Sequence, residues 1–173
     1  MATNSTFDVV SAVLSAEPIS VDQAIAAVES DTAGAVVSFS GVVRNHDGGK
    51  PVQRLSYSAH PTAHQVMADV VAQLVAEQAA GTAGAGTDAA GTASEPGAET
   101  DSTTAQPVRI WVAHRIGMLE IGDPALVCAV SAAHRGQAFA VCSELVDRIK
   151  AQVPIWKEQF FTDGTVEWVG AGA

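Results

Sequence analysis

The spacing of apolar residues in the first half of the chain predicts three strands. Residues 7–15 (FDVVSAVLS) are rich in valine, as β-strands are. In residues 34–43 (GAVVSFSGVV) the apolar and polar positions alternate, with Val37 and Phe39 on one face. The glycine-rich stretch RNHDGGK then predicts a turn, after which residues 51–60 (PVQRLSYSAH) return as a strand.

Two helices are predicted between and after these strands. Ser20 followed by Gln23 is a capping-box start, and the short helix that it opens runs to about Glu29. From Thr62 onward the apolar residues recur every four positions, which predicts an amphipathic helix.

The second half of the chain predicts strands, a helix and a terminal hairpin. Residues 108–114 (VRIWVAH) form a strand, RIGMLEIGD a connection, and residues 124–133 (PALVCAVSAA) a continuous apolar strand of the kind found at a sheet centre. A helix begins near His134 and ends before Pro154. Its expected apolar face is made of Phe139, Cys142, Leu145, Val146 and Ile149. The segments IWKEQFF and TVEWV, joined by TDG, form a C-terminal β-hairpin.

This order of elements predicts the α+β class, as a mixed-sheet α/β sandwich within a single domain of residues 1–173. The segment from about Ala79 to Pro107 contains only alanine, glycine, threonine, serine, proline, one glutamine and acidic residues. Such a composition cannot bury enough apolar surface to offset its ordering entropy. Residues 79–107 are therefore expected to be a flexible low-complexity insertion within the domain.

The acidic composition excludes some functions. A net charge of −10 argues against binding to nucleic acids or to anionic membranes, but it permits a small basic pocket. Cys128 and Cys142 form no CxxC pair and are expected to be buried, reduced thiols. No apolar run is long enough to span a bilayer, so the protein is expected to be cytoplasmic.

Several basic residues stand at the ends of predicted elements. Arg44 closes a strand, His134 and Arg135 open the last helix, Lys150 ends that helix, and Lys157 follows Pro154. An isolated lysine or arginine is usually solvated, and Lys150 would also be favoured there by the helix dipole alone. Against this simpler interpretation, a histidine and an arginine at a helix N-terminus add donors to free backbone N–H groups, which suits a phosphate.

A metal site is the weakest of the possible interpretations. His60 and His64 are four residues apart, but neither an HExxH motif nor a third ligand is evident. No metal is therefore predicted, and a metal-dependent hydrolase is the least favoured function.

Four motifs in order carry a resemblance to a known family. They are GAVVSFSGVVRNHDGG, HRIGMLEIGD, SAAHRGQAF and IKAQVPIWKEQF. Together they closely resemble the catalytic (large) subunit of molybdopterin synthase, over nearly the whole chain outside the insertion. The resemblance implies a hammerhead-like fold and a cytoplasmic sulfurtransferase of molybdenum cofactor biosynthesis.

The resemblance also implies a reaction and its partners. Sulfur would pass from the C-terminal Gly-Gly thiocarboxylate of a small ubiquitin-like carrier to cyclic pyranopterin monophosphate, which forms the dithiolene of molybdopterin. A homodimer would bind one carrier at each end, giving a heterotetramer, and no cofactor would be required. The alternative is a non-catalytic scaffold that only binds a ubiquitin-like tail.

The family motif assigns site residues to this chain by position. Lys150 and Lys157 would be catalytic, with Lys150 acting either as a charge stabiliser or as a proton donor. The residues that would contact substrate are Val42, Val43, Arg44, His134, Arg135, Lys150, Lys157, Glu158 and Gln159. Val42 departs from the family, in which a lysine is common.

Helix length adds a prediction of our own. His134 and Lys150 are sixteen residues apart on one helix, which is roughly 24 Å at about 1.5 Å per residue. One small pterin does not reach both ends of the same helix. We therefore expect a shared pocket, with His134 and Arg135 of one subunit facing Lys150 and Lys157 of the other.

Overall fold

The computed structural model describes residues 7–84 and 107–170. Its larger sheet has four strands in the order β1 (Phe7–Ser15), β5 (Val108–Arg115), β7 (Pro124–Ala132) and β2 (Ala35–Val42). The sheet is mixed, because β1 and β5 are parallel while the other neighbours are antiparallel. The α+β prediction with a mixed sheet is therefore confirmed.

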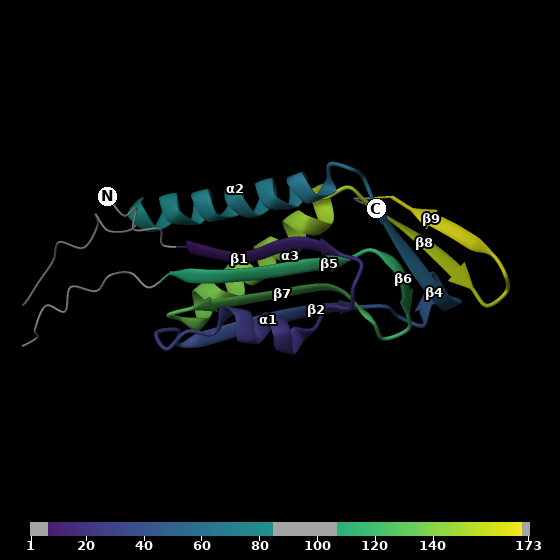
Figure 1. Ribbon diagram of the computed structural model, residues 1–173, viewed down its shortest axis with the longest axis horizontal. Coiled ribbons are helices and arrows are strands. Elements are labelled where there is room, and N and C mark those ends of the chain that lie inside the picture. The colour runs from purple at the N-terminus through teal and green to yellow at the C-terminus, as the bar shows by residue number, and fades with distance from the viewer. Residues whose placement is uncertain (1–6, 85–106, 171–173) are drawn as a thin grey trace, which may run out of the picture.

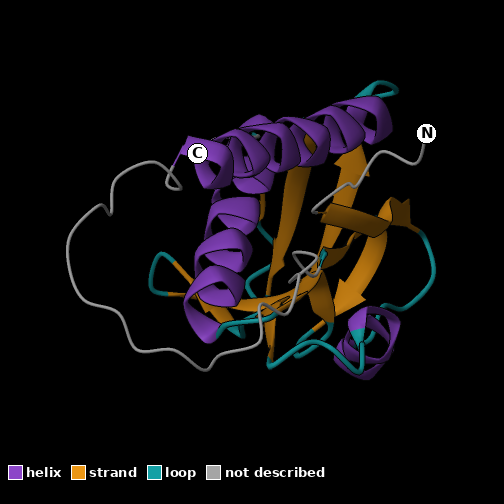
Figure 2. Ribbon diagram, turned by 90° about the vertical axis from the view of Figure 1, so that its left-hand side faces the viewer, coloured by secondary structure: helices purple, strands orange, loops and turns teal. Residues whose placement is uncertain are grey.

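Three helices cover the two faces of this sheet (Figures 1 and 2). Helices α2 (Ala63–Gly84) and α3 (Arg135–Gln152) lie on one face, and α1 (Val21–Val28) lies on the other. Side chains of β7 alternate between the two cores: Cys128 belongs to the α2–α3 core, and Val127 and Ala129 to the α1 core. Burial on both faces explains the continuous apolar run of β7.

A second, antiparallel sheet lies beyond one end of the first (Figure 1). Its strands are β3 (His46–Asp47), β4 (Lys50–Ala59), β8 (Ile155–Phe161) and β9 (Val166–Val169), and β6 (Gly117–Glu120) also pairs with β4. The β8–β9 hairpin was predicted, whereas β6 lies in a stretch that was expected to be only a connection. Its pairing with β4 is a tertiary contact that the local pattern does not reveal.

The helix ends follow the predicted signals. The Ser20 hydroxyl accepts the N–H of Gln23 at 3.4 Å, as a capping residue should. At the end of α3, Val153 N–H donates to the carbonyl of Ile149 at 3.0 Å, and Pro154 follows. None of the helices in the described ranges is both long and apolar enough to span a membrane.

Two predicted details need correction. Phe139 was expected on the buried face of α3, but this residue is 61% exposed, and Ala138 and Val141 are buried instead. Helix α2 continues to Gly84, so the first six residues of the expected insertion are helical. The rest of that segment, residues 85–106, lies outside the described residues.

Both cysteines are buried and unpaired, as the sequence predicts. Burial raises the pKa of the Cys128 thiol, and it raises that of Cys142 to about 11. Both thiols are therefore protonated at neutral pH and act as small apolar side chains of the core.

Candidate active site

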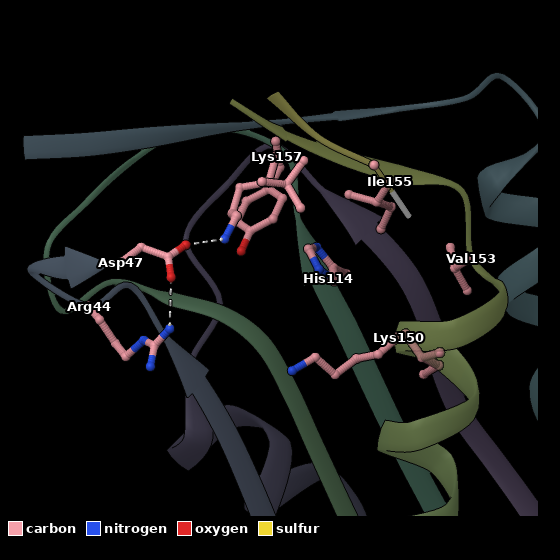
Figure 3. Close-up of a pocket in the computed structure, with 11 residues that line it drawn as sticks. Arg44, Asp47, His114, Lys150, Val153, Ile155 and Lys157 are labelled. Atoms are coloured by element: carbon pink, nitrogen blue, oxygen red, sulfur yellow. Dashed lines mark hydrogen bonds and ion pairs between the residues drawn. The ribbon is translucent and has the colours of Figure 1, made fainter. Parts of the chain in front are cut away.

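A cavity of about 520 Å³ lies where the C-terminal end of α3 meets the second sheet (Figure 3). A second cavity of about 350 Å³ adjoins it. The two share five lining residues: Arg44, Asp47, Tyr57, Lys150 and Lys157. We refer to them as the first and second lobes of one site.

The two lysines meet in this site because the chain bends sharply between them. Lys150 is in the last turn of α3, and Lys157 is the third residue of β8. The N–H of His60, just after β4, donates to the Pro154 carbonyl at 3.0 Å and ties the bend to the second sheet. Lys157 lies opposite Tyr57 in the β4–β8 pair, and both side chains line the site.

Arg44 and Asp47 reach the site from the segment that follows β2. Figure 3 shows Arg44 and Lys150 approaching the cavity from opposite sides, with Asp47 above Arg44. The Asp47 carboxylate accepts a hydrogen bond from Lys157 Nζ at 3.1 Å and pairs with the Arg44 guanidinium at 3.5 Å. Gly48 and Gly49 have φ values of 55° and 79°, which make the tight return into β4 possible.

The charges in the site are unevenly compensated. A hydrogen bond from Gln159, followed by one from Lys157, lowers the pKa of Asp47, so this carboxyl is ionised at neutral pH. Arg44 and Lys157 share its negative charge. Among the ion pairs within residues 7–84 and 107–170, none involves Lys150. Lys150 is thus the cation most available to an incoming anion.

His114 contributes a neutral imidazole to the first lobe. Its Nδ1 lies 2.8 Å from the Arg115 carbonyl oxygen, which can only accept, so Nδ1 carries the proton and Nε2 holds a lone pair. Burial, and to a smaller extent the charge of Lys150, lowers the pKa of His114, although the bond to Arg115 opposes the shift. The ring packs edge-on against Tyr57 at 5.0 Å between centroids, and burial raises the pKa of that phenol.

The structure brings together only part of the set that the sequence predicts. Arg44, Lys150 and Lys157 line both lobes, and Val42, Val43 and Gln159 line the second. Glu158 lies between two inward-facing residues of β8 and lines neither lobe, as expected from strand alternation.

His134 and Arg135 do not line either lobe. His134 is the N-cap residue of α3, without a side-chain capping bond, at the end of the helix opposite Lys150. Within one chain, these two residues are therefore separated from the site by the length of α3.

Asp47, Tyr57 and His114 belong to the site but were not singled out from the sequence. Asp47 falls in a turn-forming stretch, and Tyr57 and His114 fall in segments that were interpreted only as strands. Their neighbours in the first lobe come from other elements, so no local spacing marks them.

One of the two histidines considered for a metal site, His60, has another role. His60 Nδ1 contacts the Thr62 hydroxyl at 2.8 Å and accepts the Thr62 N–H at 3.2 Å, at the start of α2. In the part of the chain that the structure describes, no three histidine, cysteine or acidic side chains are grouped as a metal ion would require.

Comparison with known proteins gives concordant matches. A family model described as MoaE protein matches residues 14–152. The molybdopterin synthase catalytic subunit 1 of Mycobacterium tuberculosis is 36% identical over 158 residues, which are 91% of this chain and 88% of the relative. The crystal structure of molybdopterin synthase from Staphylococcus aureus is 29% identical, with a TM-score of 0.66 and coverage of 95% of this chain and 97% of that one.

A further structure supports the fold alone. It is a complex of subunits 1 and 2 of molybdopterin-converting factor from Helicobacter pylori, with a TM-score of 0.50 and 16% identity. The structural match covers 96% of this chain and 90% of the Helicobacter pylori chain.

The buried imidazole predicts a pH dependence of stability. Because the pKa of His114 is lower in the folded state than its usual value near 6.5, the unfolded chain binds more protons. The stability that the neutral ring contributes is present above pH about 6.5 and is lost as the pH falls toward the folded pKa. Relative to His114→Asn, the unmodified protein should lose stability between pH 7 and pH 5, by at most about 1.4 kcal/mol per pH unit.

Urea unfolding of both proteins at several pH values measures this difference. His64→Asn is the control, because His64 is exposed and lies outside the site. Equal pH dependence in His114→Asn and the unmodified protein would contradict the assignment of a buried neutral imidazole.

Proposed function

The chain belongs to the MoaE protein family and is a catalytic subunit of molybdopterin biosynthesis, and from this premise we propose that it is a sulfurtransferase. The sulfur would come from the C-terminal thiocarboxylate of a small ubiquitin-like carrier and pass to cyclic pyranopterin monophosphate. The observation that carries this proposal is the meeting of Arg44, Lys150 and Lys157 in one cavity of a protein whose net charge is −10.

Both reactants suit this cavity because both are anions. The thiocarboxylate carries a negative charge, and the pterin carries a phosphate. Lys150, which has no ion pair among the described residues, offers its ammonium to the thiocarboxylate and to the negative charge that develops as sulfur attacks. The apolar part of the first lobe is lined by Ile149, Val153, Ile155, Val169 and Gly170, and a Gly-Gly tail without side chains suits a cavity with such walls.

The carrier is the expected macromolecular partner. The Helicobacter pylori structure is described as a complex of two subunits of molybdopterin-converting factor, and by analogy with that protein we propose a small-subunit partner for this chain. We place the carrier's tail in the first lobe and the pterin in the second, where Val42, Val43 and Gln159 complete the wall.

The site would be completed by a second copy of the chain. His134 and Arg135 lie about 24 Å from Lys150 along α3, which is too far for one small substrate. In a homodimer with antiparallel α3 helices, the His134–Arg135 end of one copy would face the lysines of the other. The two side chains and the free N–H groups of the helix would then contribute to phosphate binding.

An apolar groove suggests where the second copy binds. The groove lies between α3 and β2, an edge strand of the larger sheet, and has a volume of about 360 Å³. Its lining includes Val37, Phe39 and Phe139. Phe139 is one helical turn after Arg135 and thus on the same face of α3, so a partner covering this exposed ring would also meet Arg135.

The first test removes the charge of Lys150. Lys150→Ala should lower product formation about a hundredfold or more, because a cation aimed at developing charge is lost. Product is measured by reconstitution with a thiocarboxylated carrier and the pyranopterin. Lys50→Ala is the matched control: Lys50 pairs with Glu167 outside both lobes, so its removal should leave turnover nearly unchanged. Normal turnover by Lys150→Ala would refute the catalytic role of Lys150, whereas absence of turnover in the unmodified protein would favour the non-catalytic scaffold.

The shared site predicts complementation between two inactive variants. In a heterodimer of Arg135→Ala and Lys150→Ala, one of the two sites receives an intact Lys150 from one chain and an intact Arg135 from the other. Random exchange of equal amounts should therefore restore about a quarter of the activity of the unmodified protein. Activity that stays at the level of the separate variants would show that the site is formed within one chain.

The groove predicts a defined effect on assembly. Phe139→Asp places a charge in the proposed contact between copies and should shift the protein from dimer to monomer, as measured by sedimentation. Trp168→Asp is the control, because Trp168 is 65% exposed on β9 and lies outside the groove. A Phe139→Asp protein that remains as dimeric as the control would place the interface elsewhere.

A further inference from the structure

Asp47 is an unusual residue to find in a site for anions. Among the described residues that line the two lobes, it is the only one with a carboxylate, and it lines them together with three cations, Arg44, Lys150 and Lys157. It pairs with Lys157 at 3.1 Å and with Arg44 at 3.5 Å. An anion that enters the site must therefore compete with this carboxylate for two of the three positive charges.

The position of Asp47 is built into the second sheet. Strand β3 pairs with β4, and this pairing sets Asp47 opposite Lys50 at the tight return through Gly48 and Gly49. Gln159, which is only 3% exposed, hydrogen-bonds the carboxylate from β8. The Asp47 and Lys157 side chains are 31% and 25% exposed, so solvent screens their interaction only in part.

The three cations of the site differ in whether they are paired with a carboxylate. Lys157 and Arg44 are held by Asp47, while Lys150 is not paired with any carboxylate of the described residues. A small anion that enters the site is attracted by Lys150 and repelled by Asp47. Tight binding of the substrate in its ground state would not raise kcat, because only interactions that strengthen in the transition state do so.

We propose that Asp47 is a specificity-determining and positioning residue of the site. It orients Lys157 and Arg44, weakens the binding of free anions such as phosphate, and directs the incoming carboxylate-like group to Lys150. This inference rests on the proposed function for its role in turnover, but its effect on anion binding is independent of sulfur transfer.

The test is phosphate binding by Asp47→Asn in the full-length protein. Inorganic phosphate is the probe, and its Kd is measured by NMR titration at low ionic strength. Removing one negative charge a few ångströms from the anion should tighten binding about three- to tenfold. Asp31→Asn is the control: it makes the same change in net charge at an exposed position outside both lobes and should leave the Kd within about twofold of the original.

A second pair of variants at Asp47 distinguishes the effect of the lost charge from an effect of lost structure. Asp47→Ser is another neutral replacement and should tighten phosphate binding as Asp47→Asn does, whereas Asp47→Glu retains the charge and should keep the original Kd. Thermal melting of each variant establishes that it is folded. Phosphate binding by both neutral variants that is no tighter than in Asp31→Asn would overturn the proposal.

Steady-state kinetics test the positioning role separately. In Asp47→Asn, KM for the pterin phosphate and kcat should both fall, because the substrate is held more tightly while Lys157 loses the partner that orients it. A fall in kcat with KM unchanged or raised would refute the specificity role. Failure of the unmodified protein to transfer sulfur would refute the proposed function but would leave the phosphate result standing.

Discussion

The end of α3 is the constraint on which the candidate site depends. The helix places Lys150 in its last turn, Val153 N–H closes that turn on Ile149, and Pro154 prevents a further one. The chain then enters β8 on the other sheet, and Lys157 returns to the same cavity. Without a sharp helix end, the two ammonium groups would lie along one helix and would not face each other across a cavity.

The larger sheet provides the rigidity that this arrangement needs. It is buried on both faces by helices, so α3 is held against β2 and β7 along its length. The second sheet extends from one end of this body, and the site lies at the junction (Figure 1). A junction between two packed sheets can gather side chains from β4, β5, β8 and the segment after β2, although these are far apart in the sequence.

Cations and one carboxylate together define the electrostatic character of the site. The protein as a whole is acidic, which keeps large polyanions away, while the junction concentrates Arg44, Lys150 and Lys157. Asp47, which accepts a hydrogen bond from Gln159, pairs with Arg44 and Lys157 and leaves Lys150 available. The neutral ring of His114 adds a hydrogen-bond acceptor beside Lys150 without adding a further charge.

The sequence by itself determined the local elements: the capped start of α1 at Ser20, the double-sided burial of β7 and the stop of α3 at Pro154. These depend on neighbours along the chain. The four motifs likewise identified the family, and they singled out the three cations that line the candidate site. Only the tertiary structure decided that Asp47, Tyr57 and His114 join them, that β6 pairs with β4 and that Phe139 is exposed. Those outcomes depend on which distant strands and helices become neighbours, and the spacing of residues along the chain does not predict such contacts.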